Sequence, residues 1–526
     1  MKYNFTGDVI HRLAQERAAD RAMLWVSEDG SLIDRNFNDL WQETSQAAGV
    51  LHEAGVKRGD VVLILLAREH EWWPLMLACL QLGVIAAPAT IQLTPKDILY
   101  RFHAASARCI IASRKSVANV EAALYQSDLA KILIGGAHPG WIDYSQRAAR
   151  VTPITSIADT EMDDDAICYF TSGTTGQPKM TIHGHGYAMA HKATATHWLQ
   201  LGPQDLHWNL SDTGWAKAAW SSLFGPWQQG SAIFVYHTTG FDSANTLAML
   251  RKFPVTTLCA PPTAYRMWVR TGLQGETFAA LKHCVSAGEP LNPEVIELWK
   301  SGTGLDIYDG YGQTETIALC ANQPGKMRRG SMGQPLPGTA LAIIDETGAQ
   351  LPPGVEGDVA LAIKPDYPSG LFKYYRGDPA RTASTFRGDW YLTGDRAYRD
   401  EDGFFWFVGR GDDVILSSGY RIGPFEVESV LFEHPAVAEA AVISSPDATR
   451  GEVVKAFIVL VPHYEPGEAL VKELQDYVRT NTAPYKYPRK IQFVERLPKT
   501  ISGKIRRKEL REAEWRNDQS ALAQLC

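Results

Sequence analysis

The chain carries the stretch Thr171-Ser172-Gly173-Thr174-Thr175-Gly176-Gln177-Pro178-Lys179 directly after the apolar run Ala166–Phe170. Glycines let backbone N–H groups approach an anion closely, hydroxyls donate further hydrogen bonds, and a lysine adds a point charge. The loop therefore predicts a polyphosphate site, although an ordinary polar surface turn is the alternative for this loop alone. Its spacing differs from the Walker loop. Met180–Ile182 is typical of a second strand, so we expect a hairpin-like turn.

Apolar runs and helical patterns alternate around this loop. Val61–Leu66 has the composition of a buried strand and precedes a helical pattern at Trp72–Leu82. Short β-branched runs at 109–112, 131–134 and 166–170 also have the composition of buried strands. This alternation predicts an α/β fold with layered subdomains and largely buried strands.

The pattern of residue types changes twice in the C-terminal part of the sequence. From about Gly330, glycine and proline punctuate short alternating strands, which predicts a β-rich subdomain at about 330–411. From Asp412, mixed helical and strand patterns predict a smaller α+β domain. We therefore expect an N-terminal domain at 1–411 and a smaller C-terminal domain at 412–526.

Composition narrows the classes of function and location. The net charge of -7 gives no reason to expect nucleic-acid binding. Seven cysteines without a Cys-x-x-Cys pair indicate free thiols in a reducing compartment and argue against a zinc site. The apolar run at 61–67 is too short to cross a bilayer, and no signal-peptide core follows Met1. We expect a cytoplasmic protein without a membrane span.

Several polar residues outside the loop are candidates on their own chemistry. Asp395 and Arg410 each adjoin a glycine at a predicted strand end, where their side chains could bind a ribose and a phosphate. The alternative interpretation is a surface salt bridge. Glu315 is a reasonable Mg²⁺ ligand, because Mg²⁺ prefers one or two carboxylates plus phosphate oxygens; a helix-starting glutamate is its alternative. Lys504 lies in a basic run, which by itself is typical of a solvated face.

Together with the loop, four later segments resemble the adenylate-forming superfamily of acyl- and aryl-CoA synthetases, nonribosomal-peptide adenylation domains and beetle luciferases. In chain order they are Asp309–Thr316; Tyr391–Asp395; Gly409–Asp413 with Ser418–Ile422; and Pro498–Lys504. Five segments in the expected order across the chain make the resemblance specific.

The resemblance implies ATP, Mg²⁺ and coenzyme A as substrates and cofactor, and it implies roles for individual residues. Catalysis is expected from Lys504, Thr314 and Glu315, with Glu315 carrying Mg²⁺ and Asp412 at the hinge. The residues expected at ATP are Thr171, Ser172, Gly173, Thr174, Thr175, Gly176, Lys179, Gly288, Glu289, Pro290, Asp309, Gly310, Tyr311, Gly312, Gln313, Thr314, Asp395, Arg410, Arg421 and Lys504. Those expected at CoA are Ser418, Gly419, Tyr420, Arg450, Arg479, Tyr487 and Arg489.

The resemblance also implies a reaction in two halves. A carboxylate attacks the α-phosphate of ATP, which gives acyl-AMP and pyrophosphate, and the CoA thiol then attacks the acyl carbon and releases AMP. Between the halves the C-terminal domain swings about its hinge, removing Lys504 and presenting Ser418–Tyr420.

The chain looks most like the medium-chain branch, so the expected substrate is a short-to-medium-chain acid of about C4–C8. Acetyl-CoA synthetases carry Trp where Gly312 stands, and a longer acid gains about 0.8 kcal/mol per buried methylene. The acyl pocket is expected at Trp215, Lys217, Trp220 and Gly312. Lys217 and Trp220 either shorten it towards smaller, branched or aryl acids, or are a CoA-facing lysine and a packing Trp.

Three other functions are alternatives to a medium-chain acyl-CoA synthetase. An aryl- or arylalkanoate-CoA ligase shares every motif. A stand-alone adenylation enzyme that loads a carrier protein would carry an acidic residue around Phe234–Tyr236, and none is there. A nucleotide sensor would need degraded catalytic groups. We expect small-molecule partners (the acid, ATP and CoA) and a monomer or homodimer.

Overall fold

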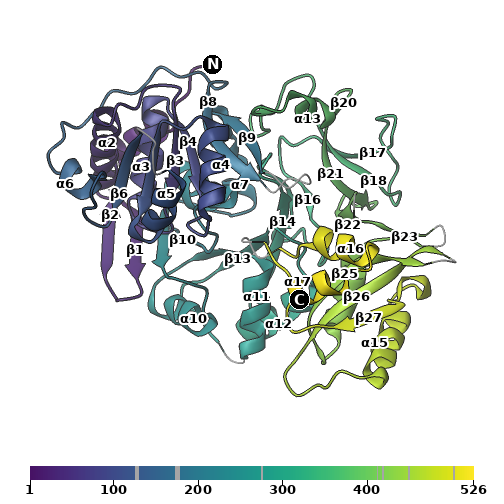
Figure 1. The fold of residues 1–526 in the computed structure, drawn as a ribbon. Coiled ribbons are helices and arrows are strands. Elements are labelled where there is room, and N and C mark those ends of the chain that lie inside the picture. The colour runs from purple at the N-terminus through teal and green to yellow at the C-terminus, as the bar shows by residue number, and fades with distance from the viewer. Residues whose placement is uncertain are drawn as a thin grey trace.

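The computed structural model describes residues 1–124, 129–171, 178–273, 276–411, 413–417, 420–447, 450–500 and 504–526. The chain forms two large sheets, whose strands are interleaved in sequence, a smaller β-rich sheet and a C-terminal sheet with its helices (Figure 1). The predicted layered α/β fold with a β-rich subdomain and a C-terminal α+β unit is confirmed.

An eight-stranded sheet holds the start and end of the polar loop. Its order is β19-β9-β8-β4-β3-β5-β6-β7. The strands are β3 (Val61–Leu65), β4 (Ile85–Ala89), β5 (Cys109–Ser113), β6 (Ala130–Ile134), β7 (Ile142–Asp143), β8 (Asp165–Thr171), β9 (Lys179–Gly184) and β19 (Tyr374–Tyr375). The strands β8 and β9 are antiparallel, and Thr171 pairs with Lys179, so these residues close the base of the predicted hairpin-like turn.

A nine-stranded sheet has the order β16-β15-β14-β13-β12-β10-β11-β1-β2. The strands are β1 (Arg21–Ser27), β2 (Leu32–Asn36), β10 (Leu206–Asn209), β11 (Ala232–His237), β12 (Thr257–Ala260), β13 (His283–Ala287), β14 (Ile307–Gly312), β15 (Ala318–Ala321) and β16 (Gln334–Pro335). From β11 to β14 the pairings are parallel, so the carboxyl ends of these strands meet at one edge.

The helices that accompany the eight-stranded and nine-stranded sheets lie in three layers. They are η1 (Thr6–His11), α1 (Arg12–Glu16), α2 (Phe37–Glu53), α3 (Trp72–Leu82), α4 (Pro95–Ala105), η2 (Arg114–Ser116), α5 (Val117–Ala123), α6 (Tyr144–Ala148), α7 (Gly186–His197), α8 (Ala216–Ala219), η3 (Trp220–Phe224), α9 (Gly225–Gln228), α10 (Ser243–Lys252), α11 (Pro262–Thr271) and α12 (Pro293–Thr303). No helix among the described residues is long and apolar enough to span a membrane.

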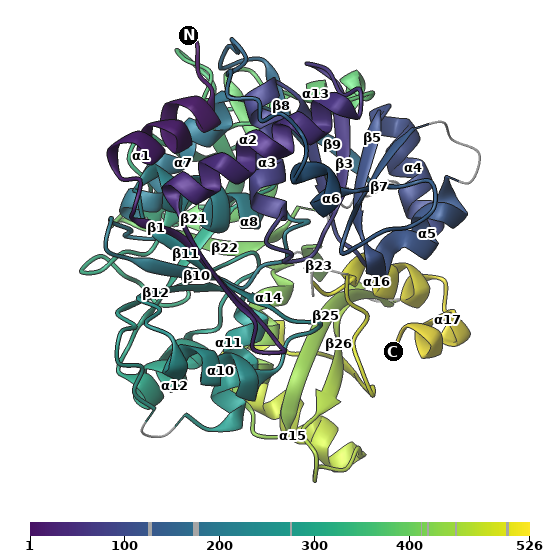
Figure 2. The ribbon, with the colours of Figure 1, turned by 90° about the vertical axis from the view of Figure 1, so that its left-hand side faces the viewer.

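The central layer explains the apolar sequence of α3. Along β3, Val62 and Ile64 face one hydrophobic core, whereas Val61, Leu63 and Leu65 face another. The first core also contains α2, α3 and α7 together with Ile233 and Val235 of the other sheet. The two sheets therefore share one helical layer (Figure 2), and a helix between two sheets is apolar on every side. The outer faces are covered by α4 and α5, and by α10, α11 and α12.

The β-rich sheet has the order β17-β18-β21-β20, with β22 beside β21. Its elements are β17 (Leu341–Ile344), β18 (Gly357–Ala362), α13 (Pro379–Ser384), β20 (Phe386–Arg387), β21 (Trp390–Arg399) and β22 (Phe405–Arg410). The C-terminal sheet follows, with the order β24-β23-β26-β25 and β27 beside β26. Its elements are β23 (Ile415–Ser417), β24 (Tyr420–Ile422), α14 (Pro424–Glu433), β25 (Val437–Asp447), β26 (Gly451–Leu460), α15 (Glu468–Asn481), η4 (Pro484–Lys486), β27 (Lys490–Phe493), α16 (Arg507–Trp515) and α17 (Gln519–Leu525).

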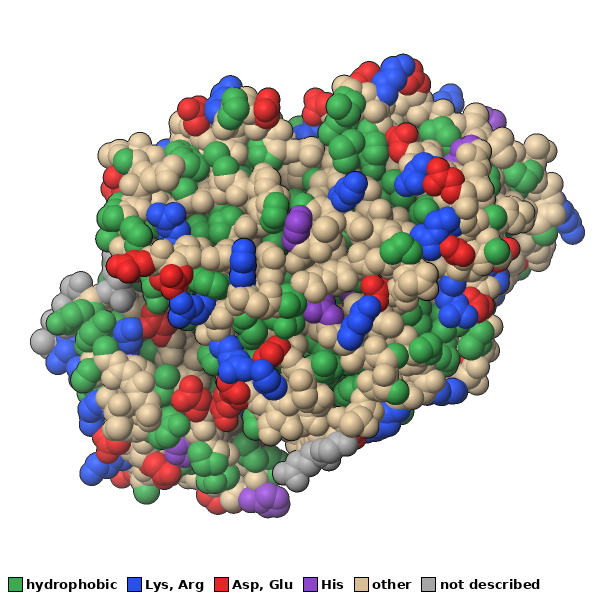
Figure 3. Space-filling view, turned by 180° about the vertical axis from the view of Figure 1, so that it is seen from behind, with side chains coloured by type: hydrophobic (Ala, Val, Ile, Leu, Met, Phe, Trp, Pro, Cys, Tyr) green, Lys and Arg blue, Asp and Glu red, His purple; other side chains and the backbone are tan. Residues whose placement is uncertain are grey.

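The surface carries charges of both signs. On the face shown in Figure 3, acidic and basic side chains are interspersed among apolar and neutral ones. This pattern fits the small net charge of -7, and any anion site must then depend on local groups rather than on an overall field.

Candidate functional site

A cavity of about 1280 Å³ lies where the four sheets approach one another. The eight-stranded sheet contributes Thr171 and Lys179, and the nine-stranded sheet contributes Gly288 to Pro290 and Asp309 to Glu315. The β-rich sheet contributes Thr393 to Asp395 and Arg410, and the C-terminal unit contributes Lys499, Thr500 and Lys504 to Glu509. One cavity thus brings together segments more than 330 residues apart in sequence, from Thr171 to Lys504.

The carboxyl ends of β13 and β14 form one wall of the cavity. In α/β sheets, ligands bind beyond the carboxyl ends of strands, where loops diverge. The turn after β13 passes through Gly288, whose φ of +113° suits glycine. It is followed by Glu289, which accepts hydrogen bonds from Thr263 (2.5 Å) and pairs with Arg266 (2.9 Å). Although burial acts in the opposite direction, Arg266, Thr263 and the charge of Lys504 lower the pKa of Glu289.

Asp395 lies at the centre of a hydrogen-bonded cluster. Its carboxylate accepts hydrogen bonds from the Tyr311 hydroxyl (2.5 Å), Gln313 Nε2 (2.8 Å) and Arg410 Nη1 (3.1 Å). The Gln313 side chain also accepts a hydrogen bond from the Tyr391 hydroxyl at 3.1 Å. Burial raises the pKa of Asp395, and the charges of Arg410 and Lys504 oppose that shift. The cluster joins β14 to β21 and β22, so the predicted Asp395 and Arg410 lie together.

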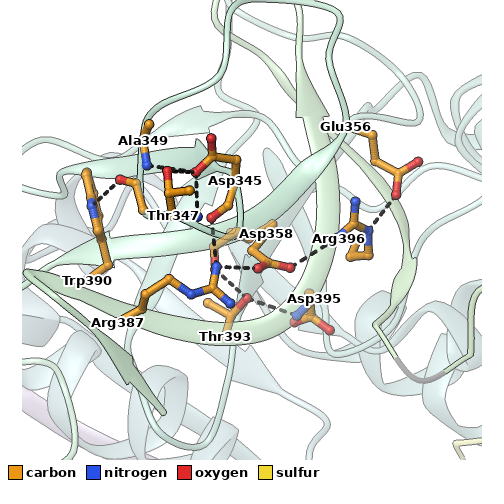
Figure 4. Close-up of polar contacts among 12 residues, drawn as sticks. Asp345, Thr347, Ala349, Glu356, Asp358, Arg387, Trp390, Thr393, Asp395 and Arg396 are labelled. Atoms are coloured by element: carbon orange, nitrogen blue, oxygen red, sulfur yellow. Dashed lines mark hydrogen bonds and ion pairs between the residues drawn. The ribbon is translucent and has the colours of Figure 1, made fainter. Parts of the chain in front are cut away.

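Ion pairs on the other face of the β-rich sheet hold β21 in place (Figure 4). Arg396, next to Asp395, pairs with Glu356 at 2.6 Å and with Asp358 at 3.2 Å. Asp358 also pairs with Arg387 at 2.8 Å. Because neighbouring residues of a strand point to opposite faces, this network fixes the face on which Asp395 points.

Lys179 and Glu315 meet at Tyr375. The Tyr375 hydroxyl donates to Glu315 Oε1 at 2.7 Å, and Lys179 Nζ lies 4.8 Å from the Tyr375 ring centroid. Burial lowers the pKa of Lys179. The buried hydroxyl of Thr171 has no hydrogen-bond partner among the described residues. A lysine, a carboxylate and an unsatisfied hydroxyl at one end of the cavity suit a phosphate with Mg²⁺, which needs only one or two protein carboxylates.

Lys504 lines the cavity beside two backbone pairings. Thr500 N donates to Lys504 O at 2.7 Å, and Lys499 forms an antiparallel bridge with Ile505. Lys504 therefore faces the same cavity as Lys179 and Asp395, which is the orientation expected for adenylation.

Of the four predicted acyl-pocket residues, two line the cavity and two lie behind its wall. Trp215 and Gly312 line the cavity, whereas Trp220 and Lys217 lie behind the wall. Trp220 instead packs against Gly312: a Cβ on Gly312 would lie 2.7 Å from Trp220 Cη2 and 2.3 Å from the Ile317 carbonyl oxygen. The Trp220 indole donates to the Tyr187 hydroxyl at 2.7 Å. Trp220 therefore occupies the space that the absent side chain of Gly312 leaves.

Lys217 is also buried. Its ammonium donates to the carbonyl oxygen of Ala287 at 2.6 Å, next to the Gly288 turn, and burial lowers its pKa. Neither of the two interpretations of Lys217 from sequence, an acyl-facing or a CoA-facing lysine, describes this contact.

The residues expected at CoA form a separate group on the C-terminal unit. Arg479 and Arg489 both contact the Tyr487 ring, at 4.2 and 4.8 Å from its centroid, and Arg489 donates to the Tyr487 hydroxyl at 2.8 Å. Tyr420 stacks on Tyr485 with centroids 4.2 Å apart. Arg450 lies just beyond the end of β25, and its backbone N–H donates to Asp447 Oδ1 at 2.9 Å. None of these described residues lines the cavity around Lys504.

Part of the predicted site lies outside the described residues. This part comprises Ser172, Gly173, Thr174, Thr175, Gly176, Asp412, Ser418, Gly419 and the side chain of Arg421. Conversely, sequence reasoning missed Tyr375 and Arg266, which belong to no motif and reach the cavity only through the tertiary fold. Tyr391 stood at the start of a quoted motif and was identifiable from it.

Replacing Asp395 with Asn tests its predicted contact with the ribose. Each hydrogen bond to a charged group contributes about 1.5–3 kcal/mol, so we expect the KM for ATP to rise roughly ten- to a hundredfold. Steady-state kinetics of Asp395→Asn measure this. Asp402→Asn, which weakens an exposed ion pair with Arg328 on the same sheet, is the control and leaves the KM unchanged. An unchanged KM in both variants contradicts the assignment.

Known proteins resemble the chain along its whole length. Acyl-coenzyme A synthetase ACSM3, mitochondrial, of Mus musculus is 49% identical over 526 residues, covering 98% of this chain and 91% of that protein. Acyl-coenzyme A synthetase ACSM4, mitochondrial, of Homo sapiens is 48% identical with the same coverage. The crystal structure of the anthranilate CoA ligase AuaEII with anthranoyl-AMP matches with a TM-score of 0.89, 30% identity and 98% coverage of both chains.

The expected cytoplasmic location is wrong. The synthetases ACSM3 and ACSM4 that match the chain are mitochondrial proteins by name. The free, mostly buried cysteines indicate a compartment that keeps thiols reduced, and this property alone does not separate the cytoplasm from the interior of an organelle.

Two family models cover most of the chain. The AMP-binding enzyme model matches residues 11–367, and the AMP-binding enzyme C-terminal domain model matches residues 426–504. The first match alone spans more than half of the 526 residues. The motifs, the layered fold and the cavity agree with this match, and the chain belongs to the AMP-binding enzyme family, the adenylate-forming superfamily that its motifs resemble.

Proposed function

We propose that the chain is an ATP-dependent acyl-CoA synthetase that activates a short-to-medium-chain acid of about C4–C8. The observation that carries this proposal is the single cavity onto which Lys179, Glu315, Asp395 and Lys504 all face. Similarity at 49% identity to an acyl-coenzyme A synthetase supports it. The division of the chain into domains at 1–411 and 412–526 is part of the proposal.

In the adenylation half, the acid's carboxylate attacks the α-phosphorus of ATP and pyrophosphate leaves. Phosphoryl transfer requires mainly alignment and neutralisation of charge. We infer that Asp395 holds the ribose hydroxyls, Lys179 and the loop hold the β- and γ-phosphates, and Lys504 stabilises charge at the reacting phosphate. Glu315 would hold Mg²⁺, which would supply further positive charge to the phosphates.

In the thioester half, the CoA thiol attacks the acyl carbon and AMP leaves. The Arg479, Tyr487 and Arg489 cluster offers two guanidinium groups and an aromatic ring to the nucleotide end of CoA. Because this cluster lies away from the cavity, we infer that the C-terminal unit rotates about Asp412 between the halves. We propose that the chain acts as a monomer or a homodimer.

The choice of acid depends on the wall made by Gly312 and Trp220. Gly312 has no side chain, and the Trp220 indole fills the space behind it. Trp220 therefore limits the length of the acid on that side. This limit supports the shorter part of the proposed range. An aryl-CoA ligase is the second candidate, favoured by the similarity to a ligase that acts on anthranilate.

The reaction class is tested by two measurements on the purified chain with ATP, Mg²⁺ and a panel of acids from C2 to C12, including branched and aryl members. We expect acid-dependent pyrophosphate release without CoA and thioester formation with CoA. An absence of acid-dependent pyrophosphate release across the panel would contradict the proposed function.

Trp220→Leu tests what limits the length of the acid. A shorter side chain behind Gly312 opens room for about two methylenes, each contributing about 0.8 kcal/mol, so the kcat/KM ratio of octanoate to butyrate should rise roughly tenfold. Trp390→Leu, at the start of β21 in the β-rich sheet, is the matched control and should leave the ratio unchanged. If the ratio stays constant in Trp220→Leu while the protein remains folded, Trp220 does not limit the pocket.

A further inference from the structure

Arg270, near the end of α11, connects the nine-stranded sheet's helices to the C-terminal unit. Its guanidinium Nη2 donates to the carbonyl oxygens of Val437, at 3.1 Å, and Ala438. The same guanidinium lies 4.8 Å from the ring centroid of Phe432 on α14. The three contacts engage the end of α14 and the first residues of β25, which lie beside α11 (Figures 1 and 2). Arg270 lines the edge of the cavity.

A short path leads from these carbonyls to Lys504. Glu439 follows Ala438 directly and forms an ion pair with Lys499 at 2.6 Å. Lys499 in turn bridges to Ile505, the neighbour of Lys504. The start of β25 therefore contacts Arg270 on one side and, on the other, Lys499, which is paired with the neighbour of Lys504.

The contact belongs to one orientation of the C-terminal unit. A backbone carbonyl of β25 accepts from Arg270 only while β25 lies against α11. An interaction that is made in one orientation and lost in another shifts the balance between the two by its own free energy. A guanidinium suits this role because one of its nitrogens, Nη2, donates to two neighbouring carbonyls while its face stacks on a ring. Asn292, which donates to Ser429 of α14 at 3.2 Å, supports the same orientation.

We propose that Arg270 is a positioning residue for the adenylation half-reaction: it holds the start of β25 and, through Glu439, Lys499 and Ile505, the position of Lys504 at the cavity. This proposal rests on the proposed function, since it assigns Lys504 to one half of that reaction. Arg270 itself touches neither substrate nor the reacting atoms in this account.

Arg270→Ala tests the proposal by separating the two halves. Acid-dependent pyrophosphate release should fall roughly tenfold or more, because losing one hydrogen bond from a charged group corresponds to about that factor and this variant loses two. Conversion of supplied acyl-AMP and CoA to thioester should stay within about twofold of the unmodified chain, a bound well below that factor. Arg270→Lys should recover part of the pyrophosphate release, because an ammonium still donates to one carbonyl. Hydrogen exchange should accelerate in peptides from α11 and from residues 432–440.

Two further variants separate the outcomes. Arg251→Ala removes an arginine of α10 that pairs with Glu276 in the same large unit, and it should change neither half. Glu439→Gln weakens the pair with Lys499 and should lower pyrophosphate release alone, so it tests the path even where Arg270→Ala is poorly folded. Equal losses in both halves, or unchanged pyrophosphate release in both variants, would overturn the role of Arg270. Absence of pyrophosphate release in the unmodified chain would overturn the proposed function instead.

Discussion

The carboxylate of Asp395 is buried, and a buried charge is tolerated only when hydrogen bonds and opposite charges satisfy it. Its partners come from two sheets: Tyr311 and Gln313 from the end of β14 and beyond, and Arg410 from the last position of β22. Satisfying this one group therefore fixes the β-rich sheet against the nine-stranded sheet. Since Arg410 directly precedes Gly411 and Asp412, the same cluster anchors the chain just before the proposed hinge.

The rest of the cavity follows from the layers. Two sheets that share a central helical layer bring the base of the polar loop close to the carboxyl ends of β13 and β14. Lys179 then lies near Glu315, with Tyr375 between them. These parts belong to the large N-terminal unit, whereas Lys504 arrives on a separate C-terminal sheet. This division would allow Lys504, the proposed catalytic group, to be withdrawn without disturbing the groups that we propose hold the nucleotide.

Local sequence predicted the elements better than their arrangement. The helix at Trp72–Leu82 matches at both ends, because its residues are apolar on every side and Gly83 adopts a left-handed conformation after it. The hairpin base at Thr171 and Lys179 followed from the apolar runs on either side of a polar loop. The shared layer between two sheets did not follow, because which faces pack together is decided by contacts between distant segments.

The same limit applies to the site. Asp395, Glu315 and Lys504 were identifiable because each lies in a motif. Tyr375, Arg266 and Arg270 have no such context, and only the fold brings them to the cavity edge. The position of Trp220 against Gly312 was equally hidden, because the two residues are 92 positions apart in sequence and meet only in the folded chain.

We infer that Lys504 completes the cavity for adenylation and acts in that half-reaction alone. Its most direct test is Lys504→Ala, with the exposed Lys472→Ala of α15 as control, assayed separately for acid-dependent pyrophosphate release and for conversion of supplied acyl-AMP and CoA to thioester. We expect Lys504→Ala to lose the first activity and keep the second, while the control keeps both. Equal loss of both activities in Lys504→Ala, or full retention of pyrophosphate release, would contradict it.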